Sequence, residues 1–167
     1  EWPGPIAKQT LSLNKLLASP GCDGGELALE QGLSEPVSYQ YDPLDPVPTK
    51  GGAGMLAFIL PNFEGASPAN VLQDGLCERQ DVLTFVTSRL ESSMLIAGKI
   101  SVNLEVSSSA PDTSFTAKLI EVFADGSAVN IRDNITSLAY RDGGFNPREY
   151  TPGESITLKI DMWPIEW

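Results

Sequence analysis

Histidine, the side chain that most often activates a nucleophile or binds zinc, is absent from this sequence. Ser-His-Asp and Cys-His arrangements need a base of near-neutral pKa, and most zinc and iron sites use imidazole ligands. A serine–lysine pair with Lys118 or Lys159 as the base stays formally open. Both lysines fall at outward positions of alternating segments, so we expect them to be exposed and solvated. We therefore predict no catalytic residue and no cofactor in this chain.

Carboxylates are the other groups that could perform chemistry. The 22 acidic residues offer many pairs, but glycoside hydrolysis needs two that face each other across about 5–9 Å, and the sequence does not identify them. Asp42 and Asp45 in YDPLDP could bind calcium through oxygen. Asp before Pro is also a frequent turn-former, and we favour the turn, with no metal bound.

Two cysteines, Cys22 and Cys77, complete the reactive side chains. They could pair, but two cysteines so far apart do not define a disulfide framework. They also do not make a zinc site without histidine or closer spacing. We expect two unpaired thiols, which leaves the compartment open between bacterial cytoplasm and periplasm.

The three tryptophans, Trp2, Trp163 and Trp167, lie at the ends of the chain. Exposed aromatic rings on a β-sandwich could bind sugars by stacking. Tryptophan at the edge of a domain can equally pack against a neighbouring domain, and we favour this second interpretation for Trp2 and Trp163.

The composition indicates a soluble globular domain. A chain of 167 residues is long enough to bury about 70% of the surface that its unfolded form exposes. The net charge of −11 repels phosphate backbones and anionic lipid, so we expect neither nucleic acid nor membrane as a partner. No apolar run approaches the ~20 residues of a membrane helix, and the first residues lack the features of a signal peptide.

The hydrophobic pattern predicts an all-β fold. We expect residues 1–36 to form an irregular arm and residues 37–167 to form a β-sandwich. Asp125-Gly126 is a strong hairpin signal, and residues 55–60 (MLAFIL) fit either a strand or a helical turn. Segments of strand character are 81–88, 99–106, 115–123, 128–142 and 156–163. The predicted inward side chains are Ile100, Val102, Leu104, Val106, Phe115, Ala117, Leu119, Ile156, Leu158, Ile160 and Met162.

One bend, SSSAPDTSF at 107–115, is either scaffold or the lip of a site. Pro111 fixes its own φ, and the side chain of Asp112 can accept hydrogen bonds from nearby backbone N–H groups. We therefore interpret Asp112 and Thr113 as turn-formers. The alternative places Asp112 at a domain interface, near the pocket of a larger protein.

Several long segments, in order, carry a resemblance to a known family. They are YQYDPLDPVPTKGG, then RQDVLTFVTSRLESSMLIAGKISVNLEVSSSAPDTSFTAKLIEVFADGSAVNIRDNITSLAYRDG, then YTPGESITLKIDMWP. From about Tyr39 to Pro164 the chain resembles the C-terminal domain of the CocE/NonD hydrolases, a family that includes X-Pro dipeptidyl-peptidases, cocaine esterase and α-amino acid ester hydrolases. The opening EWPGP is similar to the link between the catalytic and C-terminal parts in that family.

The resemblance implies a jelly-roll β-sandwich, similar to galactose-binding domains, that accompanies an α/β-hydrolase core and a helical cap. The catalytic serine, acid and histidine of the family have no counterpart here. The implied role is non-catalytic: packing on the core and cap, and helping to wall the active site. A carbohydrate-binding sandwich is the alternative from a different class.

One departure from the family pattern concerns the end of the chain. The pattern continues past Met-Trp-Pro into further strands, one with a Gly-His-Arg start and a Ser-Ser-Asn stretch, whereas this sequence ends at Trp167. We therefore expect the last strands of the jelly roll to be missing. The sheet edges they leave would be covered by a second copy of the chain, by altered pairing or by disorder.

Overall fold

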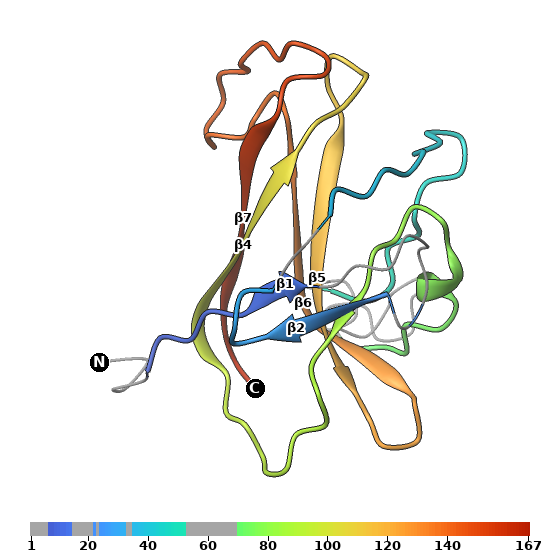
Figure 1. Cartoon of the computed structure of the whole chain (residues 1–167), viewed down its shortest axis with the longest axis vertical. Helices are drawn as coiled ribbons and strands as arrows, with labels where there is room; N and C mark the ends of the chain where they lie inside the picture. The colour runs from blue at the N-terminus through green and yellow to red at the C-terminus, as the bar shows by residue number, and fades with distance from the viewer. Residues whose placement is uncertain (1–6, 15–21, 23, 33–34, 53–69) are drawn as a thin grey trace, which may run out of the picture.

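The computed structural model describes residues 7–14, 22, 24–32, 35–52 and 70–167, and these are almost entirely strand and loop (Figure 1). The predicted all-β class is confirmed, since the one helical element in these ranges is a short 3-10 turn. The described residues contain no helix long and apolar enough to cross a membrane. The elements are β1 (Ser12–Asn14), β2 (Gly25–Ala28), η1 (Leu76–Glu78), β3 (Phe85–Val86), β4 (Ala97–Val106), β5 (Ser114–Val122), β6 (Ala128–Ser137) and β7 (Ile156–Glu166).

Two long strands, β4 and β7, pair antiparallel along most of their length. Apolar side chains alternate with polar ones on both strands, and alternate residues of a strand point to opposite faces. Val102 therefore lies opposite Ile160, and Leu104 lies opposite Leu158, on one face of the pair. Leu158 and Ile160 are almost fully buried, which confirms the predicted inward face of 156–163.

The other antiparallel pair is the β5–β6 hairpin. Its turn has the predicted Asp-Gly chemistry: Gly126 has a φ of 86°, and Asp125 Oδ1 accepts a hydrogen bond of 2.9 Å from the Ser127 backbone N–H. The register shifts between Leu119 and Ile120, where β6 has an extra residue, Ile131. The shift matters because it changes which side chains of β6 share a face with β5.

The two pairs run along the long axis of the molecule (Figure 1) and form a β-sandwich. Side chains of β6 link them: Asn134 Nδ2 donates to Asp161 O at 2.6 Å, and Arg132 Nη2 donates to Pro164 O at 3.2 Å. In the part of the chain that the structure describes, the buried apolar residues are Leu76, Leu138, Tyr150, Leu158, Ile160 and Met162. The predicted core positions Phe115, Ala117 and Leu119 are only partly buried.

The N-terminal residues differ from the expected irregular arm. β1 pairs antiparallel with β2, and β2 pairs parallel with β3, so part of the arm is a small sheet that lies across the long strands (Figure 1). Buried Asn14 stabilises it locally, because its side chain donates to Glu30 O at 2.7 Å and accepts from Gly32 N at 2.8 Å. β1 lies within residues 11–17, which fit either a short strand or a helical turn, whereas β2 was missed because four residues are too few to show a period of two.

Other expectations have mixed outcomes. The predicted strand at 81–88 is reduced to β3, and residues 55–60 lie outside the described part of the chain. One strand edge is partly covered from within the chain, because Leu72 bridges Val129 on the side of β6 away from β5. Beyond Glu166, Ile96 and Trp167 exchange backbone hydrogen bonds of 3.0 and 2.9 Å, which extends the β4–β7 ladder.

Candidate functional site

Lys118 on β5 is not exposed, so the sequence prediction for this lysine is wrong. Its side chain is only 15% exposed, and Nζ donates to Gln73 Oε1 at 2.8 Å. Asp133 Oδ2 lies 4.0 Å from Nζ. Burial lowers the pKa of Lys118, and the nearby charge of Asp133 partly opposes that effect. Lys159, by contrast, is exposed as predicted and pairs with Asp161 on the outer face of β7.

The register shift in β6 explains why Lys118 has polar neighbours. Because Ile131 is the extra residue, Asp133 and Asn130 both come to lie on the same face as Lys118. Asn130 is buried, and its Oδ1 accepts hydrogen bonds from Val71 N at 2.9 Å and from Gln73 Nε2 at 3.1 Å. The segment around Gln73 therefore covers this face of the hairpin and removes Lys118 from solvent.

We name the side chains of Gln73, Lys118, Asn130 and Asp133 the polar cluster. Gln73 Nε2 also donates to the backbone oxygens of Lys50 and Val71, so the cluster fastens two loops to the hairpin. The partners of the Lys118 amine are amide and carboxylate oxygens. Such a network fixes the conformation of the loops, and among the described residues the amine's partners include no hydroxyl.

A shallow depression of about 280 Å³ lies between β6 and the end of β7. Its lining residues are Gly52, Asn70, Ile131, Arg132, Asp133, Ile165, Glu166 and Trp167. This set has hydrogen-bonding and charged groups but no hydroxyl, thiol or amine side chain. The depression could therefore hold a small polar group, and the reactive groups in its described lining are the carboxylates of Asp133 and Glu166.

Asp42 and Asp45 lie together in the turn that the sequence suggests. Asp42 Oδ1 accepts from Leu44 N at 2.9 Å, and Asp42 O accepts from Asp45 N at 3.1 Å. Arg79 then reaches across to Asp45, donating from Nη1 to Oδ2 at 3.2 Å and from Nη2 to the backbone O at 2.6 Å. Because the turn and this guanidinium engage both aspartates, the geometry favours a loop contact over a calcium site.

Arg79 is a residue that the sequence reasoning missed. Its guanidinium also binds Asp81 in a two-point contact, with Nε–Oδ1 at 2.7 Å and Nη2–Oδ2 at 2.9 Å. These charged hydrogen bonds hold the pKa of Asp81 below its usual value. Arg79 follows directly after η1, so the contact joins that turn to the loop at Asp45. No sequence signal identifies the contact between Arg79 and Asp45, since these two residues are 34 positions apart.

The bend at Asp112 and Thr113 contacts the end of β6. Asp112 Oδ1 accepts from Ala139 N at 2.9 Å, and Thr113 O accepts from Leu138 N at 3.0 Å. Close by in the fold, the Tyr150 hydroxyl accepts from Ser108 N at 2.9 Å. These contacts join the β4–β5 loop to the residues after β6, which is a scaffold role. An interface role for Asp112 in a larger protein stays a prediction.

The tryptophans lie in different surroundings. Trp163 is 70% exposed on the outer face of β7, where Asp161 and Lys159 precede it on the same face. Trp167 is partly covered, and its indole N–H donates to Glu121 Oε2 at 3.0 Å. Trp2 lies outside the described residues.

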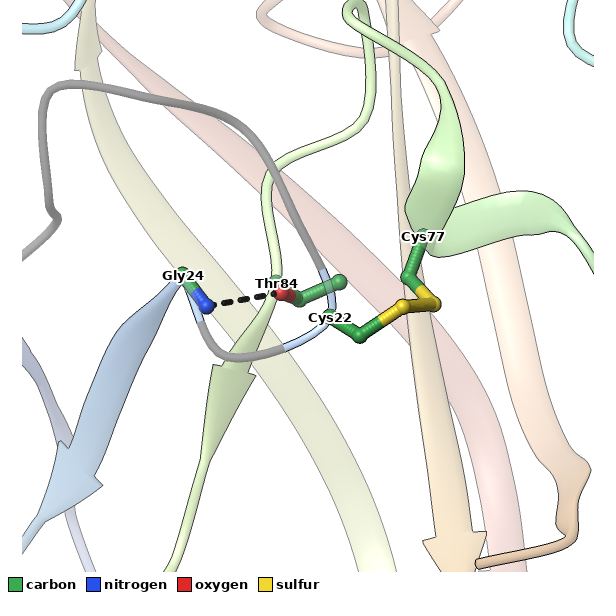
Figure 2. The surroundings of a disulfide bond; sticks show 4 residues. All are labelled: Cys22, Gly24, Cys77 and Thr84. Carbon is green, nitrogen blue, oxygen red and sulfur yellow. Dashed lines mark hydrogen bonds between the residues drawn. A yellow bond between two sulfur atoms is a disulfide. The ribbon is translucent and has the colours of Figure 1, made fainter.

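The prediction of two unpaired thiols is wrong. Cys22 and Cys77 form a disulfide, with their Cα atoms 4.7 Å apart (Figure 2). The fold brings them together across 55 positions of sequence. Their spacing could not reveal this, because the contact depends on how β2 and η1 are placed by the rest of the structure. As for metals, no group of three or more His, Cys, Asp or Glu side chains gathers within the described ranges.

Comparison with known proteins identifies the family of this chain. Residues 1–167 match the family described as "X-Pro dipeptidyl-peptidase C-terminal non-catalytic domain". The chain is also 38% identical over 146 residues to a cocaine esterase from Rhodococcus sp. (strain MB1 Bresler). That similarity covers 87% of this chain but only 24% of the relative, so the chain spans about a quarter of the length of the relative it matches.

Proposed function

We propose that this chain, which belongs to the family of X-Pro dipeptidyl-peptidase C-terminal non-catalytic domains, supports a separate catalytic part by packing against it and shaping access to its active site. One observation carries the proposal. Lys118, the candidate base, and Asp42 and Asp45, the candidate calcium ligands, are instead engaged in contacts that fasten loops of the chain. A domain built in this way offers a rigid surface, and the chemistry belongs to another part of the parent protein.

The parent is proposed to be a serine hydrolase with esterase, acylaminoacyl or X-Pro dipeptidyl-peptidase activity. The name of the relative, a cocaine esterase, supports the ester-hydrolysing class. The partners of this domain would be an α/β-hydrolase core and a helical cap in the same chain. Residues 1–36, with the small β1–β2 sheet, would form the connection to them.

The proposed contact surface includes the connection between β3 and β4. Four large apolar side chains there are exposed: Val86, Leu90, Met94 and Leu95. This surface also lies next to the arm of residues 1–36, because β2 of the arm pairs directly with β3. Several exposed large apolar side chains within one short segment are typical of surfaces that another protein part covers. We therefore place the catalytic part against the segment between β3 and β4.

The proposal is tested in the full-length parent. Removing residues 1–167 should lower the melting temperature and should change kcat/KM unequally for a small aryl ester and a bulkier X-Pro anilide, because access to the site is altered. A parent that keeps its melting temperature and both kcat/KM values after this deletion would contradict the proposal.

Point variants in the same parent locate the surface. Leu95→Ser should lower the melting temperature, since an apolar contact is lost. Phe145→Ser is the matched control, because Phe145 is 97% exposed and lies in the β6–β7 loop, at the opposite end of the molecule from the β3–β4 connection (Figure 1). Equal effects of the two variants would place the contact elsewhere.

A second candidate function, glycan binding, is favoured by the exposed Trp163. Its ring lies on a face with polar neighbours, Lys159 and Asp161, and sugars stack on such rings. If this function is correct, glycan-array binding by the chain should disappear on Trp163→Ala. Glycan binding that survives Trp163→Ala, or no glycan binding at all, would contradict a glycan site at Trp163 and leave the supporting role as the proposed function.

A further inference from the structure

The small sheet formed by β1, β2 and β3 has few described contacts with the long strands. β2 pairs with β3 at only two positions, Gly25 with Phe85 and Glu26 with Val86. Neither β1 nor β2 makes extensive contact with β4 to β7 in the described part of the chain. The β1–β2 pair therefore depends on a small number of links for its position.

Three of those links surround the start of β2, and Figure 2 shows two of them, the Gly24–Thr84 hydrogen bond and the disulfide. Gly24 N donates to Thr84 Oγ1 at a long 3.4 Å. The Phe85 ring lies against Gly25 so closely that a Cβ there would come within 2.6 Å of it. The third link is the covalent bond between Cys22 and Cys77. Of the three, only the disulfide does not break by thermal motion alone.

The two ends of the disulfide differ in how firmly they are held. Cys77 is partly buried in η1, next to the buried Leu76 and just after Gln73 of the polar cluster. Arg79, two residues further on, binds Asp45 and Asp81. Cys22, by contrast, is exposed and precedes β2. The bond thus joins an anchored residue to an exposed residue of the arm.

We propose that the Cys22–Cys77 disulfide is a redox-sensitive latch that holds the β1–β2 pair on the sandwich. A dithiol reductant attacks the accessible disulfide, one sulfur of the reductant forms a mixed disulfide, and its second thiol displaces the other cysteine. The products are the thiols of Cys22 and Cys77 and the cyclic disulfide of the reductant, so the two electrons and two protons come from the dithiol. Exposure of one cysteine favours this exchange.

Reduction releases the arm and leaves the sandwich folded. The contacts that fasten the anchored side, the polar cluster and the Arg79 contacts, contain no sulfur. Both cysteines precede β3 in the sequence, so the disulfide does not cross-link any strand of the β4–β7 or β5–β6 ladder. The latch therefore acts on the arm alone.

The consequence for the parent rests on the proposed function. If the arm is the connection to the catalytic part, the latch fixes where that connection leaves the sandwich, and reduction loosens it. The latch itself is a property of this chain, so its test uses this chain without the parent. Failure of the test would refute the latch and leave the supporting role standing.

Amide hydrogen exchange of the 167-residue chain, with and without dithiothreitol, tests the latch. In the oxidised chain the amides of β1 and β2 should be protected. After reduction their exchange rates should come within about ten-fold of the rates of an unstructured peptide. The exchange rates of the amides in β4 and β7 should stay at least about a hundred-fold below those of an unstructured peptide. A double variant, Cys22→Ser with Cys77→Ser, should match the reduced chain and should not respond to dithiothreitol.

Three results would overturn the latch. Protection of β1 and β2 that survives reduction would mean that the noncovalent links suffice. Loss of protection in β4 and β7 to the same extent would mean that the bond stabilises the whole domain. Free thiols in the oxidised sample, measured by alkylation and mass, would likewise contradict it.

Discussion

The amine of Lys118 donates to the side-chain oxygen of Gln73 at 2.8 Å, across 45 positions of sequence. Gln73 is buried, and its amide also donates to the buried Asn130. A strand of the hairpin and a loop that covers it are thus joined through one side chain. Gln73 is therefore the residue through which the polar cluster is most easily broken.

Gln73→Ala should destabilise the chain by about 2 kcal/mol, because Lys118 and Asn130 each lose a hydrogen bond and the backbone oxygens of Lys50 and Val71 lose the Gln73 amide donor. Urea unfolding monitored by circular dichroism measures this change. Gln80→Ala, which removes the same group from an exposed residue, should change stability by less than about 0.5 kcal/mol. Equal effects of the two changes would show that the cluster contributes nothing.

The Arg79–Asp81 contact predicts a specific loss of stability in acid. The pKa of Asp81 is lower in the folded state than in the unfolded state, where it is about 3.9. The folded state therefore binds fewer protons, so the contribution is complete above the unfolded pKa and is lost as the pH falls through the folded pKa.

Asp81→Asn should thus make the free energy of unfolding fall less steeply between about pH 5 and pH 2 than in the parent chain. The control is Asp74→Asn, which removes an equal charge from an exposed side chain. Urea titrations at a series of pH values give the slopes. Identical slopes for the Asp81 variant and the unchanged chain would contradict the prediction.

Tyr150 should contribute to the joining of two loops. Its hydroxyl accepts from Ser108 N at 2.9 Å and donates to Glu154 O at 2.6 Å. Tyr150→Phe keeps the ring and removes both hydrogen bonds, so we expect a loss of about 1–2 kcal/mol in thermal or urea unfolding. Tyr140→Phe, at a 44% exposed ring, serves as the control and should be near neutral.

Asp112 separates the scaffold interpretation from the interface interpretation. If its carboxylate serves to accept from Ala139 N, Asp112→Ala should cost about 1 kcal/mol in the isolated chain. Asp112→Asn retains an acceptor and should cost less. An isolated chain that is unaffected by either change would favour the interface alternative.

Periodicity predicted the long strands because burial on one face of a sheet directly sets which alternate residues are apolar. Val102 and Leu104, like Leu158 and Ile160, alternate with polar residues along their strand, and this local pattern can be read from one sequence alone. The hairpin turn at Asp125-Gly126 was predictable for the same reason, since its chemistry lies within two adjacent residues.

The candidate site was less predictable because its contacts are non-local. Lys118 has the outward parity of an exposed residue, and only the loop at Gln73 removes it from solvent. The pairing of Cys22 with Cys77 likewise depends on where β2 and η1 lie, which the spacing does not encode. The resemblance carried by long ordered segments identified the family, which no single motif could.

The central claim, a domain without chemistry of its own, is tested most directly by assaying the purified chain. Far-ultraviolet circular dichroism first establishes that the sample is folded and rich in strand. Hydrolysis of an aryl ester and of an X-Pro anilide is then measured against a buffer blank. The account predicts no turnover above the blank for either substrate, and turnover that rises with the concentration of the chain and is lost on Lys118→Met would contradict it.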